Sequence, residues 1–330
     1  LRTNKMHNDL LSRIEKKITR TINQKHAYDF DGTGIGWNKF ENNPVLSDEH
    51  GGSLFDPFVR RINGKYMMGV SNRRTKSVEL YESIEGTLWK KIGVAITGIP
   101  TSEWEKDVNR ACFLHRNSRW YLWYTGQSEG KSYIGLATSA DGRKYDRYEI
   151  NPVIKPELEF EKKSVMNPCV MYDDCSNMFK MWYAAGESYE PDVIAYAEST
   201  DGIHWKKNPI PVMSSNADFL YQKAKVGACD VVRMKDGRYC MAYIAYQNIN
   251  VARICLAYSD DGISNWIYSK SNPILSPERG KWDSHAVYKP SIVLDEENNK
   301  FLLWYNGRTN HCEQIGMAMG EQNDTVFARL

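Results

Sequence analysis

Apolar residues in this chain recur in short blocks, and the blocks themselves recur along the chain. Five segments open on an aromatic residue and continue into an apolar and aromatic run, with the aromatics at Tyr66, Trp120, Phe179, Tyr239 and Phe301. These aromatics lie 54, 59, 60 and 62 residues apart. Blocks rich in Tyr, Trp, Val and Ile and bounded by Gly, Asn and Asp are typical of buried strands. A long period built from strands and turns predicts a radial array of small antiparallel sheets, because helical and leucine-rich repeats are shorter. The predicted fold is all-β, a five-bladed β-propeller.

Two further patterns repeat with the blades. A Ser-x-Asp/Glu-Gly turn occurs at residues 83–86, 139–142, 199–202 and 259–262, and Asn-Pro connectors occur at residues 43–44, 151–152, 208–209 and 272–273. Tight hairpins select Asp and Gly, and proline fixes the backbone where the chain leaves one sheet for the next. We therefore interpret these turns as structural, with the aromatic that follows packed between neighbouring blades.

The N-terminal residues follow a different pattern. Apolar side chains recur on one face of residues 8–24, at Leu10, Leu11, Ile14, Ile18 and Ile22. This spacing predicts an amphipathic helix. Three expectations follow: the apolar face packs on the propeller rim, it joins two copies of the chain in a homodimer, or the helix is the tail of an upstream domain. The expected organisation is a helical extension over residues 1–40 and the propeller over residues 41–330.

Composition excludes several function classes. The 43 basic and 41 acidic residues are well mixed and give a net charge of +2, so no basic stripe indicates a nucleic-acid partner, and no apolar run indicates a membrane span. The seven cysteines are scattered without metal-ligand spacing. Free thiols and the lack of a visible signal peptide lead us to expect a cytoplasmic protein, and no cofactor is expected.

The first strand of each blade lines the central channel of a propeller, so the starts of these strands converge on one face. Polar and charged residues interrupt these otherwise apolar strands at comparable positions. A charge there costs free energy unless it faces water, a partner or a ligand. The candidates that follow from this alignment are Asp56, Asp107, Arg110, Asn167, Lys225, Asp230, His285 and Lys289.

With the Phe-Asp-Pro-Phe-Val sequence at residues 55–59, the blade formula and the Asn-Pro linkers, the chain resembles the five-bladed propellers of glycoside hydrolase family 43 and its relatives, families 32, 62, 68 and 130. The resemblance covers roughly residues 40–320 and implies a carbohydrate-active enzyme for an oligosaccharide or polysaccharide. Family 43 enzymes hydrolyse the glycosidic bond with inversion of configuration at the anomeric carbon. They use an Asp base on blade one, an Asp modulator on blade three and a Glu acid on blade four. The resemblance therefore predicts a glycoside hydrolase whose base and acid stand about 6.5–9.5 Å apart.

The match to these three carboxylates is uneven. Asp56 matches the base in residue and context. Asn167 stands at the modulator position, where it keeps the shape of Asp but not the charge. Asp230 stands near the acid position, although alternation along the strand leaves its face uncertain by one residue. Glu187, in a blade-three hairpin, is the other candidate acid or a surface-loop residue. Arg110 and Lys289 would bind substrate hydroxyls or an acidic substituent.

Two other functions stay open. Family 130 phosphorylases use one Asp acid and a bound phosphate as nucleophile, and Arg110, Lys225, His285 and Lys289 could together hold an anion. A carboxylate at Asp56 would repel that phosphate. A non-catalytic glycan-binding propeller of a polysaccharide-building system would need only aromatics and amides.

Aromatic and histidine side chains near the blade entries each have two interpretations. Trp37, Trp104 and Trp282 could stack on sugar rings or simply pack between strands. His285 could approach a structural calcium ion on the propeller axis, as the resemblance to family 43 implies, or be an ordinary hydrogen-bonded residue.

Overall fold

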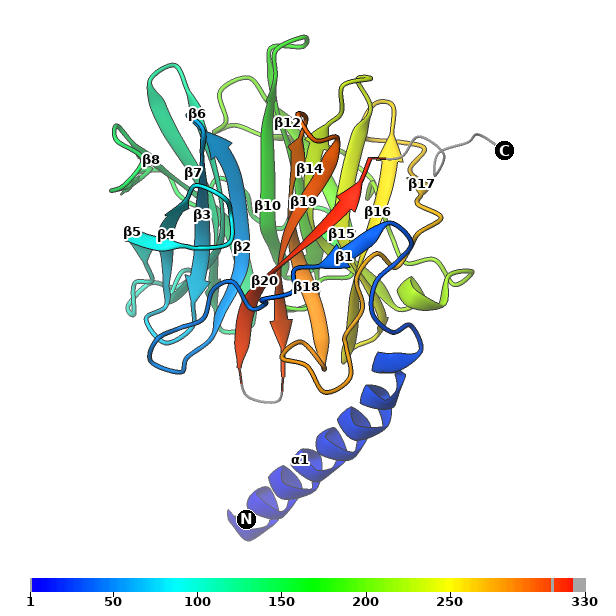
Figure 1. Cartoon of the computed structure of the whole chain (residues 1–330). Helices are drawn as coiled ribbons and strands as arrows, with labels where there is room; N and C mark the ends of the chain where they lie inside the picture. Colours follow the sequence, from blue (N-terminus) through cyan, green and yellow to red (C-terminus); the bar gives the residue numbers. More distant parts are fainter. Residues whose placement is uncertain (1, 310–311, 323–330) are drawn as a thin grey trace.

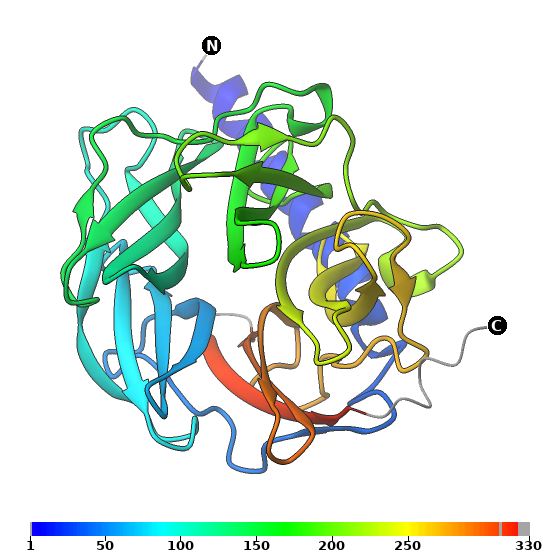
Figure 2. The same ribbon diagram turned by 90° about the horizontal axis from the view of Figure 1, so that it is seen from above.

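The structure, a computed structural model, describes residues 2–309 and 312–322. It contains the predicted five-bladed propeller, seen down its axis in Figure 2. Blade one is formed by β2 (Leu54–Ile62), β3 (Lys65–Asn72), β4 (Ser77–Ser83) and β5 (Lys90–Thr97). Blade two is formed by β6 (Asp107–Arg116), β7 (Arg119–Ser128), β8 (Lys131–Ser139) and β9 (Asp146–Arg147). Blade three is formed by β10 (Ser164–Asp173), β11 (Met178–Gly186), β12 (Val193–Ser199) and β13 (Lys206–Lys207). Blade four is formed by β14 (Lys225–Arg233), β15 (Tyr239–Asn248), β16 (Val251–Ser259) and β17 (Ile267–Tyr268).

Blade five closes the ring with strands from both ends of the described chain. Its strands β18 (Ala286–Asp295), β19 (Lys300–Arg308) and β20 (Glu313–Glu321) are joined by β1 (Trp37–Lys39), which pairs antiparallel with β20. Residues 37–39, expected in the helical extension, are therefore the outer strand of blade five. Trp37 is buried, stacked at 6.0 Å on Phe301, and covers Gly320, where a Cβ would come within 2.4 Å of the indole ring.

The seams between blades explain the repeated turns. In each of four blades the turn serine accepts a hydrogen bond from the turn glycine N–H, as Ser199 does from Gly202 at 2.8 Å. The glycine carbonyl then accepts the indole N–H of a tryptophan in a neighbouring blade, as Gly202 does from Trp123 at 2.9 Å. The same contact joins Trp182 to Gly262 and Trp304 to Gly86. The structural interpretation of these turns is confirmed.

The N-terminal helix α1 (Arg2–Gln24) begins six residues earlier than predicted and extends away from one face of the propeller (Figure 1). It continues into the 3₁₀ turn η1 (Lys25–Tyr28); two more, η2 (Glu159–Glu161) and η3 (Leu220–Gln222), precede blades three and four. The apolar face of α1 does not pack on the propeller rim, because Ile14, Ile18 and Ile22 are 45, 54 and 55% exposed. That expectation was wrong, and the homodimer stays a prediction.

Among the described residues, no helix combines the length and the apolar character that crossing a membrane requires.

Candidate functional site

Each innermost strand carries a bulge at the same level of the channel. The register with the second strand shifts there, and one residue adopts a positive φ: Asp56 (57°), Arg110 (41°), Asn167 (56°), Ala228 (22°) and Lys289 (53°). We call these five residues the pocket ring. Non-glycine residues rarely adopt this conformation, and bulges are frequent next to active sites, where they re-aim side chains. The blade-four member of the ring is Ala228, so Asp230 does not stand at the position equivalent to Asp56 and Asn167.

Two residues further along each strand lies a second ring, formed by Phe58, Cys112, Cys169, Asp230 and Ser291. We call it the clasp ring, because four of its side chains accept a hydrogen bond from a backbone N–H of the next blade. Cys112 accepts from Val170 at 3.0 Å, Cys169 from Val231 at 3.3 Å, Asp230 from Ile292 at 2.8 Å and Ser291 from Val59 at 2.8 Å. At the fifth seam Phe58 packs edge-on against Phe113, with ring centroids 5.1 Å apart. The cysteines and Asp230 thus hold the blades together.

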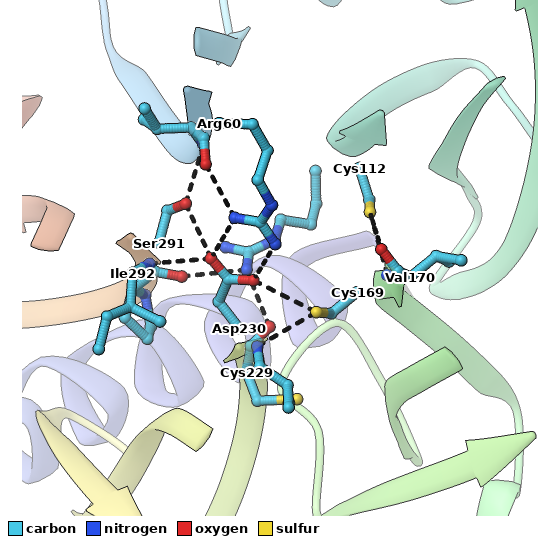
Figure 3. A network of polar contacts seen from close by, with 12 residues as sticks. Arg60, Cys112, Cys169, Val170, Cys229, Asp230, Ser291 and Ile292 are labelled. Carbon is cyan, nitrogen blue, oxygen red and sulfur yellow. Dashed lines mark hydrogen bonds and ion pairs between the residues drawn. The ribbon is translucent and has the colours of Figure 1, made fainter. Parts of the chain in front are cut away.

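Asp230 is fully buried in a dense set of contacts (Figure 3). Arg60 of blade one binds both of its oxygens, at 2.9 and 2.6 Å, and Ser291 donates to it at 2.9 Å. Burial raises the pKa of Asp230, but the Arg60 guanidinium and the N–H of Ile292 outweigh burial and leave the pKa below its usual value. A carboxylate held ionised in this way is not a proton donor. Its placement argues against the predicted role of Asp230 as the general acid.

The pocket ring, in contrast, keeps unused hydrogen-bonding capacity. Asp56 is fully buried and pairs with Lys289, whose Nζ lies 2.8 Å from Oδ1; apart from this ion pair, neither Asp56 oxygen has a described partner. Arg110 donates from one terminal nitrogen to the carbonyls of Cys229 (3.0 Å) and Pro290 (3.1 Å), whereas its Nε and other terminal nitrogen have no described acceptor. The side-chain amide nitrogen of Asn167 also has none. Buried polar atoms without partners are uncommon and mark places where water or a ligand binds.

A pocket of about 450 Å³ is lined by Lys289 of the pocket ring, by Phe55 and Asn109, which precede two other members of the ring, and by Arg20 of α1. A volume of this size suits a small-molecule site. Its charged lining residues are Arg20, Arg73, Glu190, Lys289, Arg308 and Glu313, and its aromatic ones are Phe55, Tyr189, Tyr246 and Tyr288. Of the ring itself only Lys289 reaches the lining, so Asp56, Arg110 and Asn167 lie beneath the floor.

The two carboxylates of the pocket have different partners. Glu313, at the start of β20, pairs with Arg73 at 2.6 Å and accepts from the Tyr288 hydroxyl at 3.3 Å. Glu190, in the hairpin between β11 and β12, accepts from the Tyr246 hydroxyl at 3.1 Å. Burial, followed by the charge of Glu190, raises the pKa of Tyr246 well above its usual value, so this hydroxyl stays a donor. The pocket therefore offers one carboxylate bound to a cation and one bound to a neutral hydroxyl.

Most of the other predicted residues lie outside the pocket lining. Asp107 pairs with Lys76 at 3.2 Å, Lys225 pairs with Asp192 at 2.7 Å, and Glu187 pairs with Lys163. Every side chain in these three ion pairs is partly exposed to solvent. His285 also lies outside the lining and offers its backbone carbonyl to Gln24 of α1 at 2.7 Å.

The tryptophans proposed for sugar stacking pack instead on glycines of their own blades. Trp104 lies over Gly126 and Gly135 and stacks on Tyr124 at 5.9 Å. Trp282 covers Gly307 and Gly316 in the same way. Trp37 packs on Gly320 in the same way. None of the three tryptophans lines the pocket, so their role in the structure is ordinary packing between strands.

Sequence reasoning missed Glu190, Glu313, Arg308, Tyr246 and Arg20. One signal was available for three of them: Glu190, Arg308 and Glu313, like Glu187, stand in a hairpin or at the end of a strand. Tyr246 lies within β15 and Arg20 within α1. The convergence of the lining residues depends on how far each hairpin reaches over its neighbour, which the repeat pattern does not contain. In residues 2–309 and 312–322, no group of three or more His, Cys, Asp and Glu side chains is arranged to hold a metal ion.

The pocket lies near the starts of five bulged inner strands, and similarity to known proteins shows the class of the chain, a carbohydrate-active propeller. A family model described as the glycosyl hydrolases family 32 N-terminal domain matches residues 87–223. The uncharacterized protein MT1551 of Mycobacterium tuberculosis (strain CDC 1551 / Oshkosh) is 29% identical over 213 residues, which are 61% of this chain and 67% of that protein. A 1,2-beta-oligomannan phosphorylase of Thermoanaerobacter sp. (strain X514) is 25% identical over 240 residues, 69% of this chain and 75% of that protein.

The fold agrees with a solved thermostable family-43 glycoside hydrolase, with a TM-score of 0.64 and 19% identity over 82% of this chain and 91% of that one. The chain belongs to the superfamily of five-bladed β-propeller glycoside hydrolases that includes families 32, 43 and 130. It is a carbohydrate-active enzyme of that superfamily.

Proposed function

We propose that this enzyme transfers a glycosyl unit from an oligosaccharide to inorganic phosphate, with inversion at the anomeric carbon. One observation carries the proposal: four basic residues line the pocket, whereas both carboxylates expected to form the hydrolytic pair lie buried in ion pairs beneath it. A basic pocket favours an anionic nucleophile. A phosphate oxygen that attacks the anomeric carbon needs no carboxylate base.

The reaction then requires an anion site and one acid. Lys289 and Arg308 are placed to bind phosphate, since both line the pocket and Nε of Arg308 has no described acceptor. As the phosphate oxygen forms its bond to the anomeric carbon, the glycosidic C–O bond breaks, and the acid gives its proton to the leaving oxygen. Glu190 suits that role better than Glu313, because Glu313 is tied to Arg73.

The carboxylate of Asp56, which argued against phosphate binding in the sequence, fits this proposal. It is fully buried and paired with Lys289, and it does not line the pocket. Its charge is therefore largely offset before phosphate enters, and it serves to orient the Lys289 ammonium group. The phosphorylase named above supports the same class of reaction by similarity.

Inverting hydrolysis is the second candidate, favoured by the presence of two glutamates, Glu190 and Glu313, in the lining of one pocket. In that reaction Glu313 would activate water and Glu190 would protonate the leaving oxygen. Phosphate dependence separates the two candidates.

The test is to incubate the protein with 1,2-β-oligomannan, with and without inorganic phosphate, and to follow sugar 1-phosphate by phosphorus NMR and reducing sugar by a colorimetric assay. Sugar 1-phosphate formed only with phosphate supports the proposal. Reducing sugar formed equally in both conditions supports hydrolysis and overturns it. Binding without turnover of a panel of oligosaccharides would favour the glycan-binding alternative.

A further inference from the structure

One pocket residue comes from outside the propeller. Of the described residues that line the pocket, Arg20 alone belongs to α1. Arg20, Asn23 and Gln24 are spaced i, i+3 and i+4, so they share one side of the helix. Ile18 and Ile22 lie on the other side and are exposed. The helix therefore turns its polar side, not its apolar side, toward the pocket.

The end of α1 is fixed to the strands that build the pocket. Gln24 donates to the carbonyl of His285, just before β18, at 2.7 Å, and Asn23 donates to Asn250 in the β15–β16 hairpin at 2.9 Å. Behind them, the buried guanidinium of Arg253 donates to the carbonyls of His26 and Ala27 in η1, at 2.6 and 3.2 Å. These contacts place Arg20 one turn before the anchored end.

The charge of Arg20 is not used within the described chain. Two of the four basic lining residues have partners: Arg73 pairs with Glu313 at 2.6 Å and Lys289 with Asp56 at 2.8 Å. No described carboxylate lies within ion-pair distance of Arg20 or Arg308. If Arg308 and Lys289 bind phosphate, the guanidinium group of Arg20 remains unpaired among the described residues at the edge of the pocket, where α1 lies.

We propose that Arg20 is a specificity-determining residue that binds an anionic substituent, a phosphate or a carboxylate, on the sugar at the mouth of the pocket. The proposal rests on the proposed function in so far as it assigns the inner cations to the phosphate nucleophile. A guanidinium group forms paired hydrogen bonds with either substituent. The N-terminal helix thereby selects charged over neutral sugars.

The test measures binding rather than turnover, by calorimetry with inorganic phosphate held constant. The probes are mannose against mannose 6-phosphate, and glucose against glucuronic acid, so that the two pairs distinguish a phosphate from a carboxylate. The wild-type chain should bind at least one anionic sugar about tenfold more tightly than its neutral counterpart. Arg20→Gln should lose this preference and keep its affinity for the neutral sugar.

The matched control is Lys16→Gln, which removes the same charge from an exposed residue of the same helix that does not line the pocket. The control should keep the preference. A wild-type chain with no preference in either pair, or Arg20→Gln with an unchanged preference, overturns the inference. If the wild-type chain forms no sugar 1-phosphate from oligomannan but still shows an Arg20-dependent preference for anionic sugars, the proposed reaction is refuted and the role of Arg20 stands.

Discussion

The pocket ring and the clasp ring lie two residues apart on the same five strands, yet they differ in almost every respect. In the clasp ring Asp230 has its charge matched by Arg60 and its oxygens fully bonded. In the pocket ring Asp56 has one ion pair and otherwise unpartnered oxygens. Complete satisfaction of buried polar groups rigidifies a structure, whereas strained backbone and unused bonding capacity gather at functional sites. The comparison teaches that burial of an aspartate near an enzyme pocket does not by itself indicate catalysis.

The largest effect should come from breaking the clasp ring. Arg60→Ala leaves Asp230 buried without its counter-charge, and removing one partner of a buried pair costs about 3–5 kcal/mol. Because the Arg60 side chain is 24% exposed, we expect the lower end, about 3 kcal/mol of unfolding free energy in urea denaturation. Arg61→Ala, at the neighbouring exposed position, is the control and should cost well under 1 kcal/mol. Similar losses in both variants would show that Arg60 acts by ordinary surface packing.

Glu190→Gln tests a pocket residue, which we expect to affect turnover and not stability, in contrast to a residue of the clasp ring. Loss of a general acid lowers turnover by about 10²–10⁴-fold, and the exposed position predicts little change in stability. Steady-state kinetics with phosphate and oligomannan, beside a thermal melt, measure both. Glu187→Gln, three residues away in the same hairpin and paired with Lys163, should keep activity. An active Glu190→Gln enzyme would exclude Glu190 as the acid.

The acid stability of the clasp ring follows from the lowered pKa of Asp230. A carboxylate whose pKa is lower in the folded state stabilises the fold above its unfolded pKa, here near 3.8, and this contribution is lost as pH falls through the folded value. Unfolding free energy of the wild type should therefore fall below about pH 4. Asp230→Asn should be less stable at neutral pH and should lack this component. Parallel pH profiles for the two proteins would contradict the assignment.

A cysteine of the clasp ring tests the hydrogen bonds between blades with no change in the net charge of the chain. Cys169→Val enlarges the side chain slightly. It leaves the Val231 N–H without its acceptor and Asp230 without the thiol that donates to it at 3.2 Å, which should cost about 1–3 kcal/mol. Cys169→Ser restores an acceptor and should be closer to the wild type in the same denaturation experiment. If valine were the better replacement, packing rather than hydrogen bonding would explain the cysteine.

A small effect on stability is expected for Asp56→Asn in the pocket ring. Lys289 faces the pocket with 21% of its side chain exposed, so water can replace the lost carboxylate, and the change should stay below about 1 kcal/mol. Phosphate affinity, measured by calorimetry, should change because Lys289 is no longer held. A loss as large as that of Arg60→Ala would mean that the two rings are equally structural.

The architecture could be predicted from the sequence because each blade repeats the same local pattern of strands and turn residues. Tight turns such as Ser199–Gly202, and the aromatics that donate to them, have local signals and identical roles in several blades. Asp230 was misplaced because the blade-four bulge falls between Gly227 and Cys229, one residue shorter than the shift in the other blades. The pocket-ring position of blade four is therefore held by Ala228, two residues before Asp230.

The residues that line the pocket could not be predicted from the repeat pattern, because they meet through contacts between elements that are distant in the chain. Glu190 reaches Tyr246 of the next blade only because its hairpin extends over that blade. Arg20 reaches the pocket because three polar contacts set the direction of α1, and the apolar stripe of that helix suggested a different packing. Contacts between elements distant in the chain are decided by tertiary geometry, so they could not be derived from residue patterns.

The pairing of β1 with β20 has a consequence for how the molecule is made. Trp37 emerges from the ribosome long before Gly320, its partner in β20, so until β20 is made the outer strand of blade five has nothing to pair with. Contacts this distant in sequence form late and slowly. The circle is completed only after β20 has been added, and a nascent chain is until then an open arc with two unpaired edges.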